Sequence, residues 1–262
     1  MKTRFKYLFK ITFIGFLLLS TELSHAQRKN IIINNELSKN AEMMKVKMGT
    51  QWMGRIWKFK FGDYAVEKSK MSWKVIKQKA TILHTKNEYK SGYKFNFVLS
   101  NKTSDSAIVR AVYSNNINEL ESIELFPNIY FGSDEILKDS LSFTADISLN
   151  NTTDNKWKLF LKRTSGSEIE YKNEGVLVNG DRIISIIFVN SNLDGNDKRW
   201  FPALGYEFME NEKAICALQY FGGGALGYNK NIIWIDSSLN QKMKLILAAA
   251  MTAILQIKSP GG

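Results

Sequence analysis

The feature that most constrains this chain is a regular alternation of apolar and polar residues. Between Leu141 and Leu149, apolar side chains alternate with Ser, Thr and Asp side chains without a break. Successive side chains of a β-strand point to opposite faces, so this period of two is typical of a strand with one buried face. The same period recurs at Trp57–Phe61 and Tyr93–Ser100, where the apolar positions are mostly aromatic. The chain is therefore expected to be mainly β.

Further strands are expected along most of the chain. They lie at Trp73–Leu83, Ala107–Tyr113, Lys156–Lys162, Glu168–Val178, Arg182–Val189, Ala214–Phe221 and Asn231–Ile235. Two of them flank Asn179-Gly180, a pair that favours a two-residue hairpin turn because both residues tolerate a positive φ angle. Such strands joined by short turns predict an antiparallel β-sandwich or a partly closed barrel.

Two helices are also predicted. The apolar residues from Leu239 to Ile257 recur at helical spacing, and Ser238 is a candidate N-cap. Because this segment is apolar almost all round, we expect a C-terminal helix over residues 238–258, packed against the sheet. Near the start, the apolar residues of the segment 37–48 fit a short helix, and the last of them also fit a strand.

The first 26 residues have the three zones of a secretory signal peptide. Basic residues up to Lys10 precede an apolar stretch, Ile11–Leu19, which is too short to span a bilayer, and Ser24-His25-Ala26 provides a small-x-small cleavage site. We predict cleavage after Ala26 and export to the periplasm or the extracellular space. The remaining residues, 27–262, contain no linker rich in Pro, Gly or Ser, and we expect a single β-rich domain without a transmembrane span.

The mature chain would hold one histidine, His84, and one cysteine, Cys216. This excludes an intrachain disulfide and leaves no cluster of His and Cys for a metal, so we predict neither a metal nor a cofactor. The glycines between Gly222 and Gly227 match the spacing of a dinucleotide-binding loop. A strand and not a helix is expected to follow them, so they indicate a glycine-rich connection instead.

The charge is distributed unevenly along the chain. The whole chain has a net charge of +11, but residues 27–102 hold 17 Lys and Arg against 5 Asp and Glu, whereas residues 103–262 hold 15 against 19. A segment with this excess indicates an anionic partner. For an exported protein we expect an anionic lipid or an acidic polysaccharide, and not a nucleic acid.

Within the basic segment, five lysines are candidate ligand-binding residues. They fall at the polar positions of predicted strands with aromatic or apolar opposite faces: Lys58, Lys60, Lys77, Lys79 and Lys94. If these strands pair, the lysines form a cationic plate backed by an aromatic layer. The alternative interpretation is that they protect exposed strand edges against aggregation.

These observations favour an exported, non-catalytic binding protein, and we predict no catalytic residues. One alternative is a glycan hydrolase, because paired carboxylates can act as acid and base on a glycosidic bond. The chain offers three acidic groups for this role: Glu168 with Glu170, Glu207 with Glu210 and Glu212, and Glu119 with Glu121 and Glu124.

A second alternative is a carrier of a small apolar ligand. A barrel followed by a helix is similar in outline to the lipocalins. The lipocalin motif G-x-W is not matched, because Gly49 and Trp52, like Gly54 and Trp57, are one residue further apart than the motif requires.

Overall fold

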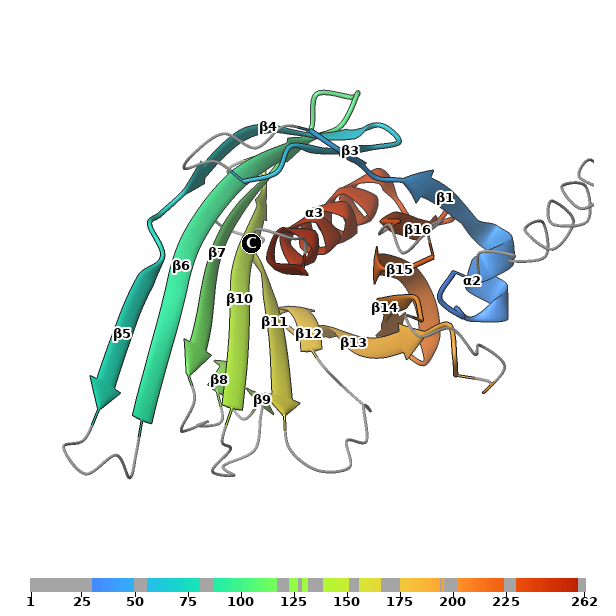
Figure 1. Cartoon of the computed structure of the whole chain (residues 1–262). Helices are drawn as coiled ribbons and strands as arrows, with labels where there is room; N and C mark the ends of the chain where they lie inside the picture. Colours follow the sequence, from blue (N-terminus) through green and yellow to red (C-terminus); the bar gives the residue numbers. More distant parts are fainter. Residues whose placement is uncertain are drawn as a thin grey trace, which may run out of the picture.

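The computed structural model describes residues 30–49, 56–80, 87–116, 123–126, 129–131, 139–150, 156–165, 175–193, 195, 202–223 and 230–258. Within these residues the chain is mainly antiparallel β-structure followed by a helix, which confirms the predicted fold class (Figure 1). The predicted signal peptide, residues 1–26, lies outside the described residues.

One 14-stranded sheet dominates the fold. In chain order its strands are β1 (Ala41–Lys45), β2 (Lys47–Met48), β3 (Phe59–Phe61), β4 (Tyr64–Met71), β5 (Val75–Ala80), β6 (Asn87–Ser100), β7 (Ser106–Asn116), β10 (Asp139–Leu149), β11 (Lys156–Ser165), β12 (Gly175–Asn179), β13 (Arg182–Asn190), β14 (Leu204–Glu210), β15 (Lys213–Phe221) and β16 (Ile232–Asp236). A separate hairpin consists of β8 (Ile123–Phe126) and β9 (Ile129–Phe131). The helices are α2 (Asn35–Asn40) and α3 (Gln241–Lys258).

The sheet curves into a nearly closed barrel (Figure 1). Its strands follow the order β1-β16-β15-β14-β13-β12-β11-β10-β7-β6-β4-β3-β2, and β5 pairs with β6. Although β1 and β2 lie at opposite ends of this order, only Val46 separates them in the chain. The Val46 N–H donates to the carbonyl of Asn231 at 3.0 Å. One stretch of chain therefore pairs first with β16 and then with β3, and it joins the two ends of the sheet.

The helix α3 occupies the concave side of the barrel (Figure 1). Every residue from Leu245 to Gln256 is buried, as a helix that is apolar all round requires. The Gln256 side chain accepts a hydrogen bond from the Trp57 N–H at 3.1 Å and donates one to the Trp57 carbonyl at 2.8 Å. This amide thus takes the place of a neighbouring strand for Trp57. Neither helix of the described residues has the length and apolar character needed to cross a bilayer.

Aromatic side chains form much of the core around α3. Phe59, Phe97, Phe143 and Phe208 are each at most 1% exposed and come from four strands of the barrel. The rings of Phe95 and Phe143 stack with their centroids 6.0 Å apart. The aromatic strand faces expected at residues 57–61 and 93–100 therefore face inward.

A second apolar cluster covers β13–β16 on the side away from α3. Ile31 and Leu37, from the N-terminal segment and α2, pack with Val189, Ala217 and Trp234. The N-terminal segment is also held by polar contacts, because the Ile31 N–H donates to the side chain of the fully buried Gln219 at 3.0 Å. Residues 30–40 therefore close the convex side of this half of the barrel.

The predicted helix near the start was wrong beyond Asn40, where α2 ends and β1 begins. Pairing of β1 with β16 buries Met44 in the core, and this tertiary contact overrides the local helical spacing. The C-terminal helix begins at Gln241, later than residue 238. Its cap is Asn240, whose side chain accepts from the Met243 N–H at 2.9 Å.

The predicted hairpin between β12 and β13 is confirmed, but its turn is displaced by one residue. Asn179 pairs with Arg182, so the two turn residues are Gly180 and Asp181. Gly180 has a φ angle of 54°, which suits the first central position of a type II′ turn, where glycine is preferred.

Candidate functional site

Three of the five candidate lysines have described side chains, and all three are exposed. Lys58 and Lys60 flank the buried Phe59 at β3, and Lys94 lies on β6 between the buried Tyr93 and Phe95. Their ammonium groups therefore lie on the convex side of the barrel, away from α3. The other two candidates lie in β5, where Lys77 pairs with Lys90 and Lys79 with Glu88.

β4 runs between β3 and β6 and adds two lysines to the same side. A register shift at Glu67 changes the alternation, so that Lys68 pairs with Val98 and Lys70 with Asn96. Direct partners in an antiparallel pair share a face. Lys47 on β2 also belongs to this face, because it pairs with Lys60. We call these residues the lysine face; all of them are exposed: Lys47, Lys58, Lys60, Lys68, Lys70 and Lys94.

The register of the lysine face sets like charges against each other. The β2–β3 pair places Lys47 directly opposite Lys60. A like-charge pair at this position is destabilising, by an amount comparable with the roughly 0.2–1 kcal/mol that an opposite-charge pair gains. Protection of sheet edges does not explain Lys60 or Lys94, because β3 and β6 have partner strands on both sides.

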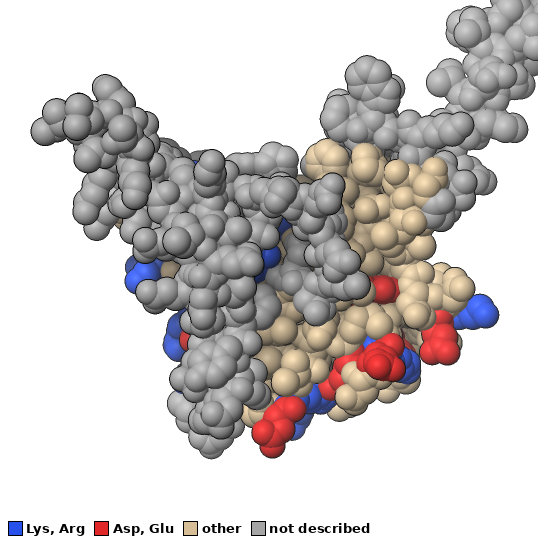
Figure 2. Space-filling view, turned by 90° about the horizontal axis from the view of Figure 1, so that it is seen from below, with Lys and Arg blue, Asp and Glu red and all other residues tan. Residues whose placement is uncertain are grey.

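Acidic side chains offset this charge only locally. Asp63 forms an ion pair with Lys102, and Glu67 accepts a hydrogen bond from the Ser100 hydroxyl. On β7 and β10 positive and negative side chains are matched, since Arg110 lies directly opposite Asp146 in the strand register. In Figure 2, which shows the molecule from below, blue and red side chains lie close to one another towards the lower right of the visible face. The lysine face thus carries six lysines, with Glu67 as an acidic neighbour of Lys58 and Lys68.

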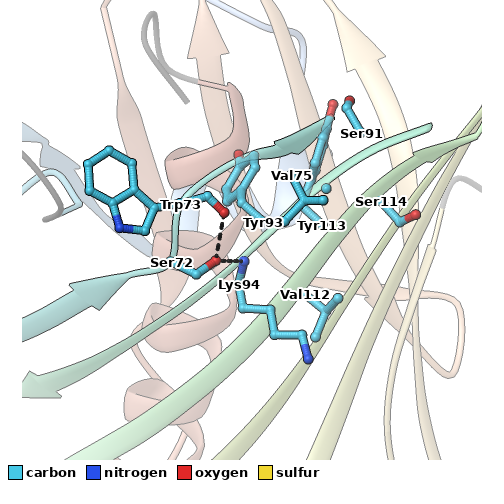
Figure 3. A pocket seen from close by; sticks show the side chains of 10 residues that line it. Ser72, Trp73, Val75, Ser91, Tyr93, Lys94, Val112, Tyr113 and Ser114 are labelled. Carbon is cyan, nitrogen blue, oxygen red and sulfur yellow. Dashed lines mark hydrogen bonds between the residues drawn. The ribbon is translucent and has the colours of Figure 1, made fainter. Parts of the chain in front are cut away.

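A β-bulge separates β4 from β5 along β6. The Ser72 N–H donates to the Lys94 carbonyl at 2.7 Å, and Val75 pairs with Gly92, so Trp73 and Lys74 together lie opposite Tyr93. The Ser72 hydroxyl accepts from the Lys94 N–H at 2.8 Å and donates to the Trp73 carbonyl (Figure 3). Such a bulge redirects side chains, and here Trp73 is 91% exposed.

A pocket of about 620 Å³, which we call the bulge pocket, lies at this irregularity (Figure 3). The residues along it include Trp73, Val75, Val112, Tyr93 and Tyr113. The rings of Tyr93 and Tyr113 stack with their centroids 4.9 Å apart on the opposite face from Val112. Its polar lining comes from Ser72, Ser91, Lys94 and Ser114, and Gly92 completes it. None of the described residues that line it is acidic.

Two polar groups lie beside the bulge pocket, on opposite faces of β6. The Tyr93 hydroxyl is buried and has no hydrogen-bond partner among the described residues, although burying a hydroxyl without one costs about 1–3 kcal/mol. Burial, followed by the neighbouring Tyr113, raises the pKa of Tyr93, so its hydroxyl keeps its proton and can donate. The Lys94 side chain lies alongside Val112 in Figure 3 and supplies a positive charge.

The described carboxylates of the hydrolase hypothesis do not converge. Glu207 is 6% exposed and accepts a hydrogen bond from the Asn34 N–H, Glu210 forms an ion pair with Arg182, and Glu212 is exposed in a turn. Burial raises the pKa of Glu207, and the hydrogen bond from Asn34 opposes this effect. Residues 119, 121, 168 and 170 lie outside the described part of the chain, and only the backbone of Glu124 is described.

The remaining reactive side chains are placed as follows. Cys216 is fully buried, and burial, followed by the nearby Glu207 carboxylate, raises the pKa of its thiol well above the ordinary value. This environment disfavours the reactive thiolate. His84 lies outside the described residues. Within the described ranges, no three His, Cys, Asp or Glu side chains are placed to hold a metal ion.

Sequence reasoning missed Lys47, Lys68, Lys70 and the bulge pocket. The signal for β4 was weak, because the bulge at Glu67 interrupts its alternation.

Comparisons of the chain with protein-family models, with curated proteins and with solved structures found no match.

Proposed function

We propose that this is an exported, non-catalytic binding protein that attaches to an anionic lipid surface through the lysine face. The observation that carries the proposal is the gathering of exposed lysines from β2, β3, β4 and β6 on one convex side of the barrel. Each lysine near an anionic membrane contributes roughly 1 kcal/mol, so the six together can supply on the order of 6 kcal/mol at moderate salt.

A lipid surface is favoured over an acidic polysaccharide by the apolar residues beside the lysines. Trp73 is 91% exposed and Val75 is 55% exposed, a few residues after Lys70. Tryptophan concentrates at membrane–water interfaces, where its ring lies at the level of the lipid head groups. A polysaccharide of acidic sugars would bind the lysines without needing the aliphatic side chains.

The test uses the chain from residue 27 to 262 with vesicles of a neutral lipid and with vesicles containing a fraction of anionic lipid. We expect cosedimentation with the anionic vesicles alone, and weakening as the salt concentration rises. Replacing Lys60, Lys68 and Lys70 together by Gln is expected to weaken binding about 100-fold, from roughly 1 kcal/mol per lysine.

The matched control replaces three exposed lysines elsewhere by Gln, namely Lys39, Lys156 and Lys242. It has the same net charge as the first triple variant and is expected to retain most of the binding. Equal losses in both variants would mean that net charge, and not the lysine face, determines binding. Retention on an acidic-polysaccharide column without vesicle binding would overturn the choice of a lipid.

A further inference from the structure

We infer that the outer edge of β5 binds an extended acidic segment of a partner protein, which adds to the sheet as a further strand. This inference is independent of the proposed function, because it uses the backbone of one edge strand and not a lipid surface. β5 pairs with β6 on one side, and no strand of the described ranges pairs with it on the other (Figure 1). Such an edge presents backbone N–H and carbonyl groups on which a further strand can form.

The hydrogen bonds of β6 show which groups of β5 point outward. The Lys94 N–H donates to the Ser72 hydroxyl and the Lys94 carbonyl accepts from the Ser72 N–H, so both backbone groups of Lys94 face β4 and β5. Strand residues bond alternately to their two neighbouring strands, and β6 keeps a regular register with β7. The odd-numbered residues of β5 therefore bond to β6. The even-numbered ones present their N–H and carbonyl groups at the free edge: Ile76, Gln78 and Ala80.

The sequence around this edge is strongly basic. Residues 68–80 include five lysines and no Asp or Glu. Three of these lysines belong to β5 or directly precede it: Lys74, Lys77 and Lys79. An incoming strand with Glu at alternate positions would place carboxylates opposite lysines in the register, and opposite charges at such positions stabilise a pair of strands. Charge complementarity therefore favours an acidic segment.

A second copy of the chain fits this edge less well. Two copies of β5 that use all three outward-facing residues pair antiparallel, with the two Gln78 residues opposite each other. Each Lys77 then lies directly opposite a Lys79, and two like-charge pairs of this kind are destabilising. The lysines therefore disfavour self-association while admitting a strand of opposite charge, which makes the edge selective.

β5 lacks two of the features that close a sheet edge, because it is six residues long and contains no proline. It also carries an exposed apolar side chain, since Ile76 is 57% exposed. Ile76 pairs with Ser91, which is three residues from Lys94 on β6, so Ile76 lies on the face opposite to the lysine face. An apolar side chain of the incoming strand can cover Ile76 on that face. We therefore expect the partner segment to alternate acidic and apolar residues.

The experiment measures, by fluorescence anisotropy, the binding of a labelled peptide of alternating Val and Glu to the chain 27–262. We expect binding that weakens as the salt concentration rises, and at least tenfold weaker binding of a peptide with Lys in place of Glu. With Glu opposite Lys77, the Val residues lie opposite Ile76 and Gln78 and bond to β5. N-methylation of the Val residues is therefore expected to abolish binding, whereas N-methylation of the Glu residues, whose N–H groups point away, is not.

A proline variant tests the same geometry in the protein. Gln78→Pro removes an N–H that points outward, and edge strands tolerate proline at such a position. We expect this variant to unfold at the same urea concentration as the wild type and to bind the Val–Glu peptide at least tenfold more weakly. Replacing Lys77 and Lys79 together by Gln is expected to weaken binding about tenfold. In the unchanged protein, hydrogen exchange of the Ile76 and Ala80 amides is expected to slow at least tenfold when the peptide binds.

The remaining outcomes also decide the question. Absence of peptide binding, equal binding of the Lys peptide, or binding unaffected by N-methylation of Val would each overturn the inference. Dimerisation of the chain that Gln78→Pro abolishes would overturn the choice of an acidic segment in favour of a second copy. The vesicle test relies on Lys60, Lys68 and Lys70, and Gln78→Pro is expected to leave vesicle binding unchanged. The failure of one proposal is therefore distinguishable from the failure of the other.

Discussion

Replacing Gln256 by Ala is expected to destabilise the barrel strongly, because one amide holds the end of α3 to the sheet. Gln256 is 3% exposed and bonds both the N–H and the carbonyl of Trp57. The substitution leaves two partly buried backbone groups without partners, and each costs about 1–3 kcal/mol. Water entering the site would partly hydrate these backbone groups. We therefore expect the free energy of unfolding to fall by about 2–4 kcal/mol, a large part of the 5–15 kcal/mol typical of folded proteins.

The assay is urea unfolding of the chain 27–262, followed by circular dichroism. Thr252→Val is the matched control, because Thr252 is also a buried polar residue of α3 but its hydroxyl bonds only to the Ala248 carbonyl of the same helix. We expect this variant to lie within about 1 kcal/mol of the wild type, since the Ala248 carbonyl keeps its helical partner. A Gln256→Ala variant no less stable than Thr252→Val would refute the role of the amide.

Three further predictions concern stability. Burial raises the pKa of Glu207, so its ionisation lowers the stability of the wild type as the pH rises above about 4.3. The Glu207→Gln variant should therefore become more stable relative to the wild type between pH 4 and 7. A stability advantage of this variant that shrinks over the same range would contradict the argument. For Asp236 burial acts to raise the pKa, but hydrogen bonds from Ser238 and the Lys213 ammonium, at 3.1 Å, lower it overall. Asp236→Asn should therefore cost about 1.5–3 kcal/mol at pH 7, and this cost should diminish below about pH 4 in the same unfolding assay. Gly180→Ala is expected to cost about 1–2 kcal/mol from the positive φ angle alone, as nothing lies within 4 Å of its Cβ position; thermal unfolding would check this, and an unchanged midpoint would exclude a strained turn.

Strands with one buried face were predictable because the alternation of apolar and polar residues in the sequence indicates directly which side chains are buried. β10 is an example, since Phe143, Ala145 and Ile147 are all buried. β4 was not predicted, because the bulge at Glu67 shifts its alternation. Val66 points inward before the bulge, and Ser69 and Met71 point inward after it, so the two-residue period is broken. β14 was missed for another reason: Glu207 reads as part of an acidic turn but is buried beneath the N-terminal segment.

Some features of the candidate site were likewise predictable from the sequence, and others were not. Lys58, Lys60 and Lys94 could be assigned to an exposed face because each lies between aromatic residues that must be buried. The bulge pocket could not be predicted, because it arises from the one-residue mismatch with which β4 and β5 pair with β6. Such a mismatch between distant segments leaves no period in the local sequence.

The two halves of the convex surface differ in a way that bears on function. Over β13–β16 the convex side is closed by Ile31, Leu37 and their neighbours, and Glu207 on β14 is buried. Over β2–β6 the strands also bury their aromatic side chains against the concave core, yet their convex side carries the exposed lysine face and Trp73. Since α3 already completes the core, the lysines are not needed for packing, and Lys47 faces Lys60 in a like-charge pair that reduces stability. A charged surface that packing does not require and that costs stability supports the proposed attachment to an anionic surface.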